Sequence, residues 1–184
     1  MCNRSDKAMT SWKPNALDAR MAISVLVCCV VSTALTACDI KFPVGEMRLE
    51  IIQKMTACIA CLLCCQGDVA SSAKAGVTRV VVTAVGGLVG MGVVALDMAL
   101  GSNPWILVVL VALGLVCTLC LCRLAGVPAF NARIGGITFL LVACTLSGTA
   151  RLWYALFRLV STVFGALVVF VVTLPFARRP ADAH

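Results

Sequence analysis

Charged and titratable residues are scarce in this chain of 184 residues. Asp, Glu, Lys and Arg make up 12% of it, whereas about 25% is typical of a soluble domain. The single histidine is the last residue, His184, and none of the eight acidic residues lies in the middle of an apolar stretch. Acid–base pairs, proton relays and metal sites are built from such residues. The sequence therefore argues against an enzyme, and it predicts neither a cofactor nor a metal site.

Apolar residues, by contrast, make up 61% of the chain, and the mean hydropathy is +1.05. This composition is typical of an integral membrane protein. Six apolar stretches can be counted, at 21–38, 51–66, 77–97, 104–122, 134–149 and 155–176. We therefore predict an all-α fold, an integral membrane bundle of six transmembrane helices. The transmembrane domain is expected at 21–176, between short cytoplasmic tails at 1–20 and 177–184.

The six stretches differ in length. A helix needs about 20 apolar residues to cross the hydrocarbon core of a bilayer, and four of the stretches meet this comfortably, while 134–149 is near the lower limit. The weakest is 51–66, because Glu50 and Lys54 leave an uninterrupted apolar core of only Met55–Cys65. Lys54 is expected to extend towards the interface, or this stretch is partly re-entrant.

The positive charges lie at the ends of the stretches, so the net charge of +7 does not indicate nucleic-acid binding. Lys and Arg are concentrated in the two tails and in alternate loops: Arg4, Lys7, Lys13, Arg20, Lys74, Arg79, Arg123, Arg133, Arg178 and Arg179. The positive-inside rule then places both termini in the cytoplasm, with six crossings. We predict a multi-pass protein of the bacterial inner membrane.

A motif occurs twice, 79 residues apart, each time near the start of an apolar stretch. Arg79-x-x-x-Thr83-x-x-Gly86 recurs as Arg158-x-x-x-Thr162-x-x-Gly165. An internal repeat of this length indicates two related halves. With three crossings in each half, the two copies run in opposite directions, so we predict an inverted repeat.

The glycines of the motif have a simpler explanation. Small residues four apart, as in Gly86-x-x-x-Gly90 and Ser161-x-x-x-Gly165, allow two helices to approach closely. Two helices that pack on each other across a pseudo-twofold axis would explain Gly86, Gly90 and Gly165 as packing residues. The arginines are not explained in this way.

Arg79 and Arg158 stand two to four positions inside their apolar stretches. Either one alone is explained by a side chain that extends to the lipid headgroups. Their equivalence in the repeat favours a function, because two cations at a shared interface, one from each leaflet, would guide an anion across. Thr83 and Thr162 are candidates to donate hydrogen bonds to the same solute, although threonine in a membrane helix often bonds its own backbone.

Cysteine is abundant, with twelve residues, and the spacing Cys58-x-x-Cys61-x-x-Cys64-Cys65 is similar to the start of an iron–sulfur motif. The group lacks the polar surroundings that a cluster or metal needs, so we interpret these residues as small apolar side chains. Thiol redox chemistry stays open as an alternative.

Leu35-Thr36-Ala37-Cys38 is similar to a lipoprotein cleavage site, but the sequence after it is membrane-spanning, unlike an exported soluble domain.

The two motifs resemble those of a known family. Arg79–Gly90 and Leu156–Leu167 are similar to the hallmark segments of the fusaric acid resistance and aromatic acid exporter membrane domain, and Gln66 matches one position of the family's turn after its second helix. The resemblance covers residues 20–176. It implies a six-helix membrane unit that exports aromatic or other organic carboxylates.

From these observations we expect a membrane transporter that exports organic anions by a uniporter-like or channel-like route, with Arg79, Arg158, Thr83 and Thr162 as the residues that guide the anion. A single six-helix unit is expected to need a partner subunit, so a homodimer is predicted. Two other functions stay open. One is a membrane scaffold that associates through its Gly-rich helix faces, and the other is a membrane thiol-redox protein.

Overall fold

The computed structural model describes residues 16–38, 41–44, 47–101, 103–145 and 150–177. Within these ranges it contains six helices and one hairpin of two strands: α1 (Ala16–Ala37), β1 (Lys41–Val44), β2 (Met47–Glu50), α2 (Lys54–Cys64), α3 (Val69–Ala99), α4 (Pro104–Leu124), α5 (Ala129–Cys144) and α6 (Ala150–Ala177). Most of the two predicted tails lies outside the described residues. Residues 16–20 are described, and they belong to α1, which therefore begins before the start predicted at residue 21.

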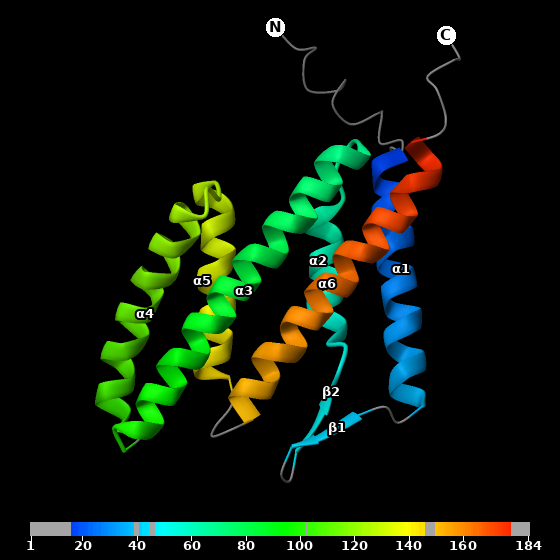
Figure 1. Ribbon diagram of the computed structural model, residues 1–184. Coiled ribbons are helices and arrows are strands. Elements are labelled where there is room, and N and C mark those ends of the chain that lie inside the picture. Colours follow the sequence, from blue (N-terminus) through cyan, green and yellow to red (C-terminus); the bar gives the residue numbers. More distant parts are fainter. Residues whose placement is uncertain (1–15, 39–40, 45–46, 102, 146–149, 178–184) are drawn as a thin grey trace, which may run out of the picture.

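The helices run alternately up and down the bundle, and α3 and α6 lie side by side and antiparallel across its middle (Figure 1). α5 and α4 flank α3 on one side, while α2 and α1 flank α6 on the other. The first residue of α1 and the last residue of α6 lie at the same end of the bundle (Figure 1). The helical fold class with six helices is thus confirmed.

Four helices, α1, α3, α4 and α6, are long and apolar enough to cross a membrane. The two short helices are α2, with 11 residues, and α5, with 16. At 1.5 Å per residue, α2 is only about 16 Å long, roughly half the thickness of the hydrocarbon core. These are the two weaker stretches of the sequence: 134–149 is near the lower limit for a crossing, and a partly re-entrant segment was one of two alternatives for 51–66.

The short hairpin at one end of the bundle was not predicted. β1 and β2 are antiparallel, with Lys41 opposite Glu50 and Phe42 opposite Leu49, and the hairpin lies where α1 ends and before α2 begins (Figure 1). Because the hairpin ends at Glu50, α2 begins only at Lys54 and is short.

An N-cap residue sets the start of α3. Asp68 is the N-cap, and its carboxylate accepts a hydrogen bond from the backbone N–H of Ser71 at 2.9 Å. Hydrogen bonds from the side chain and the backbone of Ser71 lower the pKa of Asp68. The cap starts α3 at Val69 rather than near residue 77, so the polar residues between these positions, Lys74 among them, form an additional two turns of helix.

Glycines bring the central helices into close contact with their flanking helices. A Cβ atom on Gly86 would collide with the carbonyl oxygen of Gly135 in α5. A Cβ atom on Gly165 would lie 2.6 Å from the carbonyl oxygen of Ala57 in α2. Gly86 and Gly165 therefore lie against α5 and α2 rather than against each other, and these two Gly-rich faces are occupied within the chain.

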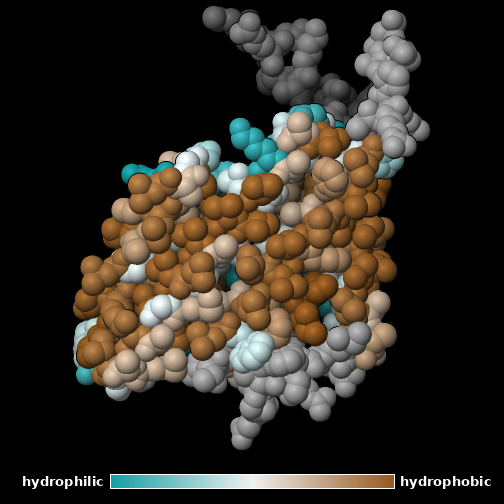
Figure 2. Space-filling model, in the orientation of Figure 1, coloured by the Kyte–Doolittle hydropathy of each residue, from teal (hydrophilic) through white to brown (hydrophobic). Residues whose placement is uncertain are grey.

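The outer surface of the bundle is apolar. Figure 2 shows a broad hydrophobic band around the helices, with hydrophilic residues gathered at the end where α2 meets α3. Leu26, Leu88, Leu113 and Val171 are each more than half exposed. A surface of this kind is stable only in contact with lipid, so the protein is a multi-pass membrane protein.

Candidate functional site

Arg79 is buried in the centre of the bundle. Its side chain is 7% exposed, and neither Nε nor Nη1 has a hydrogen-bond partner among the described residues. Since a guanidinium carries five N–H donors, much of its hydrogen-bonding capacity is left unused. Arg79 is a buried cation without a described partner.

Arg158 is the second buried cation, 8% exposed. Its Nη1 donates to Oγ1 of Thr56 in α2 at 3.2 Å and, over 3.5 Å, to the hydroxyl of Tyr154 one turn earlier in α6. Nε has no partner in the described part of the chain. Both acceptors are neutral, so they leave the charge of Arg158 uncompensated.

The two arginines lie well inside their helices. Because α3 begins at Val69 and α6 at Ala150, Arg79 and Arg158 follow the starts of their helices by about 15 Å and about 12 Å, respectively, at 1.5 Å per residue. Counted instead from the starts of the apolar stretches at residues 77 and 155, the arginines stand two to four positions inside, because the first turns of both helices precede these stretches. Their burial also excludes the alternative in which each side chain extends outwards to lipid headgroups.

The crossing of α3 and α6 brings the two cations towards each other. A Cβ atom on Gly76 would lie 3.3 Å from that of Ala166, so these positions face each other at the crossing. Arg79 follows Gly76 by three residues, and Arg158 precedes Ala166 by eight. In antiparallel helices both displacements point to the same end, so the arginines are offset by about 7–8 Å along the bundle. The positive charges of the two arginines are close enough to repel each other.

No described carboxylate pairs with either arginine. The ion pair found among the described residues joins Arg151 Nη1 to Asp97 Oδ2 at 3.6 Å, where α3 ends and α6 begins. Asp97 is the acidic residue closest to the middle of an apolar stretch, and it lies at the far end of α3 from Arg79. A buried charge without a partner costs several kcal/mol. The repulsion adds to this cost, and an anion between the arginines would remove both penalties.

The two motif threonines are both buried but differ in their bonding. Thr83 Oγ1 has no hydrogen-bond partner in the described part of the protein. Thr162 Oγ1 donates to the carbonyl oxygen of Arg158 at 2.9 Å, the intrahelical bond expected of threonine in a membrane helix. Thr83 is therefore available to a ligand, whereas the Thr162 hydroxyl is already engaged by its own helix.

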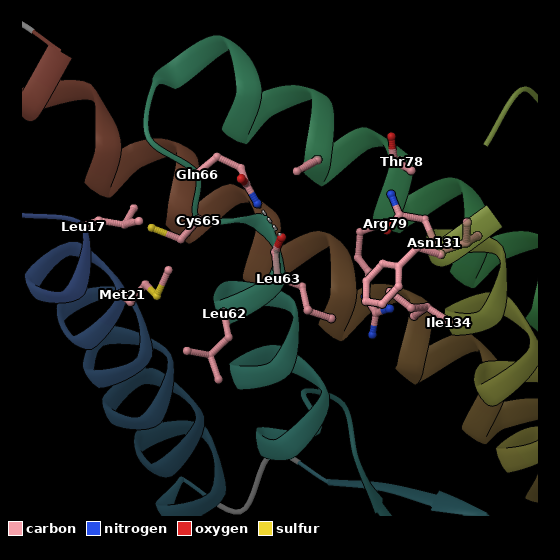
Figure 3. A pocket seen from close by; sticks show the side chains of 13 residues that line it. Leu17, Met21, Leu62, Leu63, Cys65, Gln66, Thr78, Arg79, Asn131 and Ile134 are labelled. Atoms are coloured by element: carbon pink, nitrogen blue, oxygen red, sulfur yellow. Dashed lines mark hydrogen bonds between the residues drawn. The ribbon is translucent and has the colours of Figure 1, made fainter. Parts of the chain in front are cut away.

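A cavity of about 390 Å³ opens beside Arg79, between α1, α2, α3 and α5 (Figure 3). Its walls are mostly apolar, with a few polar side chains: Leu17, Met21, Leu62, Leu63, Cys65, Gln66, Ala75, Thr78, Arg79, Val82, Phe130, Asn131 and Ile134. In Figure 3 the Asn131 side chain lies next to Arg79, while Gln66 is on the opposite side of the cavity. The cavity has the size and the mixture of groups typical of a small-molecule site.

The sequence of residues 44–172 matches the family model described as fusaric acid resistance protein-like. The match covers more than half of the chain. The chain belongs to this family. No curated protein matches the sequence.

Membership in the fusaric acid resistance protein-like family indicates a membrane transporter. The matched region contains both arginines and all of α2–α5. Among the described residues, no group of three or more His, Cys, Asp or Glu side chains is placed to hold a metal ion.

Several residues around the two buried arginines were not predicted as site residues. Thr56 and Tyr154 bond Arg158, while Phe130 and Asn131 form part of the cavity wall next to Arg79. Tyr154 could have been found, because it precedes Arg158 by four residues and therefore shares its helix face. Thr56, separated from Arg158 by 102 residues, carried no such signal.

Proposed function

We propose that this protein exports organic anions, aromatic carboxylates among them, and that Arg79 and Arg158 bind the anion's charge. The observation that carries the proposal is the pair of buried guanidiniums with unused N–H donors and no described counter-ion. Arginine binds carboxylates through two parallel N–H···O bonds, each stronger than a bond between neutral groups. A carboxylate would satisfy the donors that Arg79 leaves free.

The cavity beside Arg79 supports an anion with an apolar body. Leu62, Leu63 and Ile134 offer an apolar wall, and Phe130 adds an aromatic ring against which a second ring can pack. Asn131 can orient a carboxylate at the charged side. A volume of about 390 Å³ accommodates a molecule with one or two rings.

The membrane potential is sufficient to drive export. An anion that leaves a cell with an inside-negative potential gains about 2.3 kcal/mol per charge per 100 mV. Proton coupling would need a titratable carboxylate near the anion, and Asp97, the described acid nearest to the membrane interior, is paired with Arg151 instead. We therefore propose a uniporter-like or channel-like route rather than a proton antiporter.

The pattern of helix contacts supports an inverted repeat. If α1, α2 and α3 correspond to α4, α5 and α6, the contact of α3 with α5 corresponds to that of α6 with α2, and both occur. The same holds for α1 with α2 and α4 with α5, and for α1 with α6 and α4 with α3. Gly86 on α5 and Gly165 on α2 are likewise equivalent contacts. Such repeats place the solute site at the interface between the halves.

The distribution of positive charges supports a location in the bacterial inner membrane. It also supports an orientation in which the start of α1 and the end of α6 face the cytoplasm. Arg20, Lys74 and Arg123 lie at the end of the bundle from which α1 starts and at which α6 finishes. Cations are enriched on the cytoplasmic side of membrane proteins. The cavity beside Arg79 would then open towards the cytoplasm, the side from which an exported anion enters.

A homodimer remains part of the proposal. The groove between α3 and α6 is lined by apolar residues, Val77, Ala166, Leu167 and Phe170 among them, with Gly76 at its base. A second copy of the chain could cover this face, which would bring the pathways of two protomers side by side.

Electrical measurements test the route directly. With a tenfold gradient of benzoate across a planar bilayer that contains the protein, we expect the reversal potential to shift by about 59 mV, since a factor of ten is 1.36 kcal/mol and 100 mV is 2.3 kcal/mol. Neutral benzoic acid carries no current, so its diffusion does not contribute. We expect a superimposed pH gradient to leave the reversal potential unchanged, and a shift that follows the proton gradient would contradict the uniporter-like route.

A substitution of Thr56, the neutral hydrogen-bond partner of Arg158, tests whether Arg158 binds the anion without removal of its charge. Thr56→Val preserves the shape of the side chain but removes the oxygen to which Arg158 Nη1 donates. An anion no longer competes with this oxygen, so we expect the apparent affinity for benzoate to rise about threefold to tenfold, in line with a hydrogen bond worth about 1 kcal/mol. Thr138→Val in α5, whose hydroxyl bonds Ile134 in its own helix, is the matched control. A weaker affinity in Thr56→Val would show that Thr56 contacts the anion itself.

A further inference from the structure

Two pairs of cysteine thiols lie at the contact between α1 and α2. Cys28 Sγ lies 3.2 Å from Cys61 Sγ, and Cys29 Sγ lies 3.5 Å from Cys58 Sγ. The first pair is fully buried, whereas Cys29 is exposed on the surface of the bundle and Cys58 is half-buried. Adjacent cysteines in one helix thus face two cysteines one turn apart in the other.

The two pairs differ in their contacts with other polar groups. Cys61 Sγ also lies 3.3 Å from the carbonyl oxygen of Gly165, so the buried pair is part of a hydrogen-bonded contact with α6. Among the described residues, the thiols of Cys29 and Cys58 contact only each other as polar groups. A thiol is a weak donor and a weak acceptor, so this contact adds little to packing. Its distinctive property is that two sulfurs need only approach by about 1.5 Å to form a bond of 2.05 Å.

We propose that Cys29 and Cys58 form a modification site, a reversible disulfide that links α1 to α2 on exposure to an organic hydroperoxide. Cys29, the exposed thiol, attacks the peroxide: its sulfur is oxidised to a sulfenic acid, the O–O bond breaks and an alcohol leaves. Cys58 Sγ then attacks Cys29 Sγ, the S–S bond forms and the S–O bond breaks, and the displaced hydroxyl group leaves with the thiol proton of Cys58 as one water. The buried pair, Cys28 and Cys61, stays reduced.

The bond would restrain two helices that contact the site. α1 contributes Leu17 and Met21 to the cavity wall, and α2 contributes Leu62 and Leu63 and carries Thr56. A link between Cys29 and Cys58 also closes the hairpin at 41–50 within a covalent loop. An apolar hydroperoxide can reach Cys29 from the lipid, because this residue lies on the apolar surface.

Peptide mapping tests the assignment without reference to transport. Cleavage after Lys and Arg places Cys29 in the peptide 21–41 and Cys58 in the peptide 55–74. After treatment of the purified full-length protein with tert-butyl hydroperoxide and alkylation of the free thiols, we expect these peptides to be linked through Cys29 and Cys58. We expect the linked product to fall at least tenfold in Cys29→Ser and in Cys58→Ser, and dithiothreitol to separate it.

Two variants serve as controls. Cys28→Ser removes the buried pair, and Cys117→Ser/Cys120→Ser removes two exposed thiols of α4. Both are expected to keep the link at wild-type abundance. Absence of the link in the wild-type protein, or a link that fragment spectra assign to Cys28 and Cys61, would overturn the proposal. A monodisperse size-exclusion profile for each serine variant excludes misfolding as the cause of a loss.

Discussion

Replacement of both arginines by glutamine, Arg79→Gln/Arg158→Gln, is expected to lower the benzoate current about 100-fold. Each guanidinium would donate charge-assisted hydrogen bonds to the anion, and a hydrogen bond to a charged group contributes about 1.5 kcal/mol or more. The loss of two such contacts amounts to about 3 kcal/mol, which is slightly more than a factor of 100. Glutamine keeps much of the side-chain length and its polarity, so the change removes mainly the charge.

The double variant is not expected to unfold. Removal of two buried, mutually repelling cations without described counter-ions relieves an electrostatic cost, so the thermal stability of the double variant should equal or exceed that of the wild type. The matched control is Arg123→Gln/Arg133→Gln, which removes two exposed arginines from α4 and α5. We expect this control to retain the wild-type current. Equal currents in both double variants would show that the buried arginines do not guide the anion.

The second large effect is expected on stability, from a pair of adjacent glycines. Gly86→Ala places a methyl group against the carbonyl oxygen of Gly135, which belongs to the backbone of α5 and cannot rotate away. Overpacking costs about 1–3 kcal/mol, and we expect the upper end of this range. A Cβ on Gly87 meets nothing within 4 Å, so Gly87→Ala should be neutral or stabilising by up to about 1 kcal/mol, because alanine is the better helix former.

Thermal unfolding in detergent, followed by the monodisperse fraction in size-exclusion chromatography, distinguishes the two variants. We expect the midpoint of Gly86→Ala to fall by several degrees and that of Gly87→Ala to stay within a degree of the wild type or to rise. Gly165→Ala, which meets Ala57 of α2 in the same manner, should behave like Gly86→Ala. Equal midpoints for Gly86→Ala and Gly87→Ala would contradict the close approach of α3 to α5.

Much of the fold could be predicted from apolar length alone. The hydrophobic stretches identified six helices, and the interruption by Glu50 and Lys54 marked 51–66 as the weakest stretch, where α2 has only 11 residues. Helix starts were harder to predict, because the polar turns at the start of α3 resemble a loop in composition. The cap at Asp68 extends the helix through them. This extension adds about two turns before the apolar stretch and leaves the position of Arg79 within that stretch unchanged.

The site could be predicted only in part, because a repeat identifies equivalent residues but not their neighbours. The doubled motif selected Arg79 and Arg158, and both lie buried near the crossing of the two central helices. Their surroundings depend on contacts distant in sequence. Thr56 meets Arg158 from α2, and Phe130 closes the cavity from α5. The thiol pairs could not be predicted for the same reason. The sequence does not show that Cys28 and Cys29 lie opposite cysteines of α2, because this depends on the packing of α1 against α2.

Calorimetric titration of the detergent-solubilised protein with benzoate and with benzamide tests the central claim most directly. The two ligands have the same ring and nearly the same shape, but only benzoate carries a charge. We expect benzoate to bind at least tenfold more tightly than benzamide, and Arg79→Gln/Arg158→Gln to abolish the difference. Equal affinities of the wild-type protein for the two ligands would contradict the account, because buried arginines without counter-ions must favour the anion.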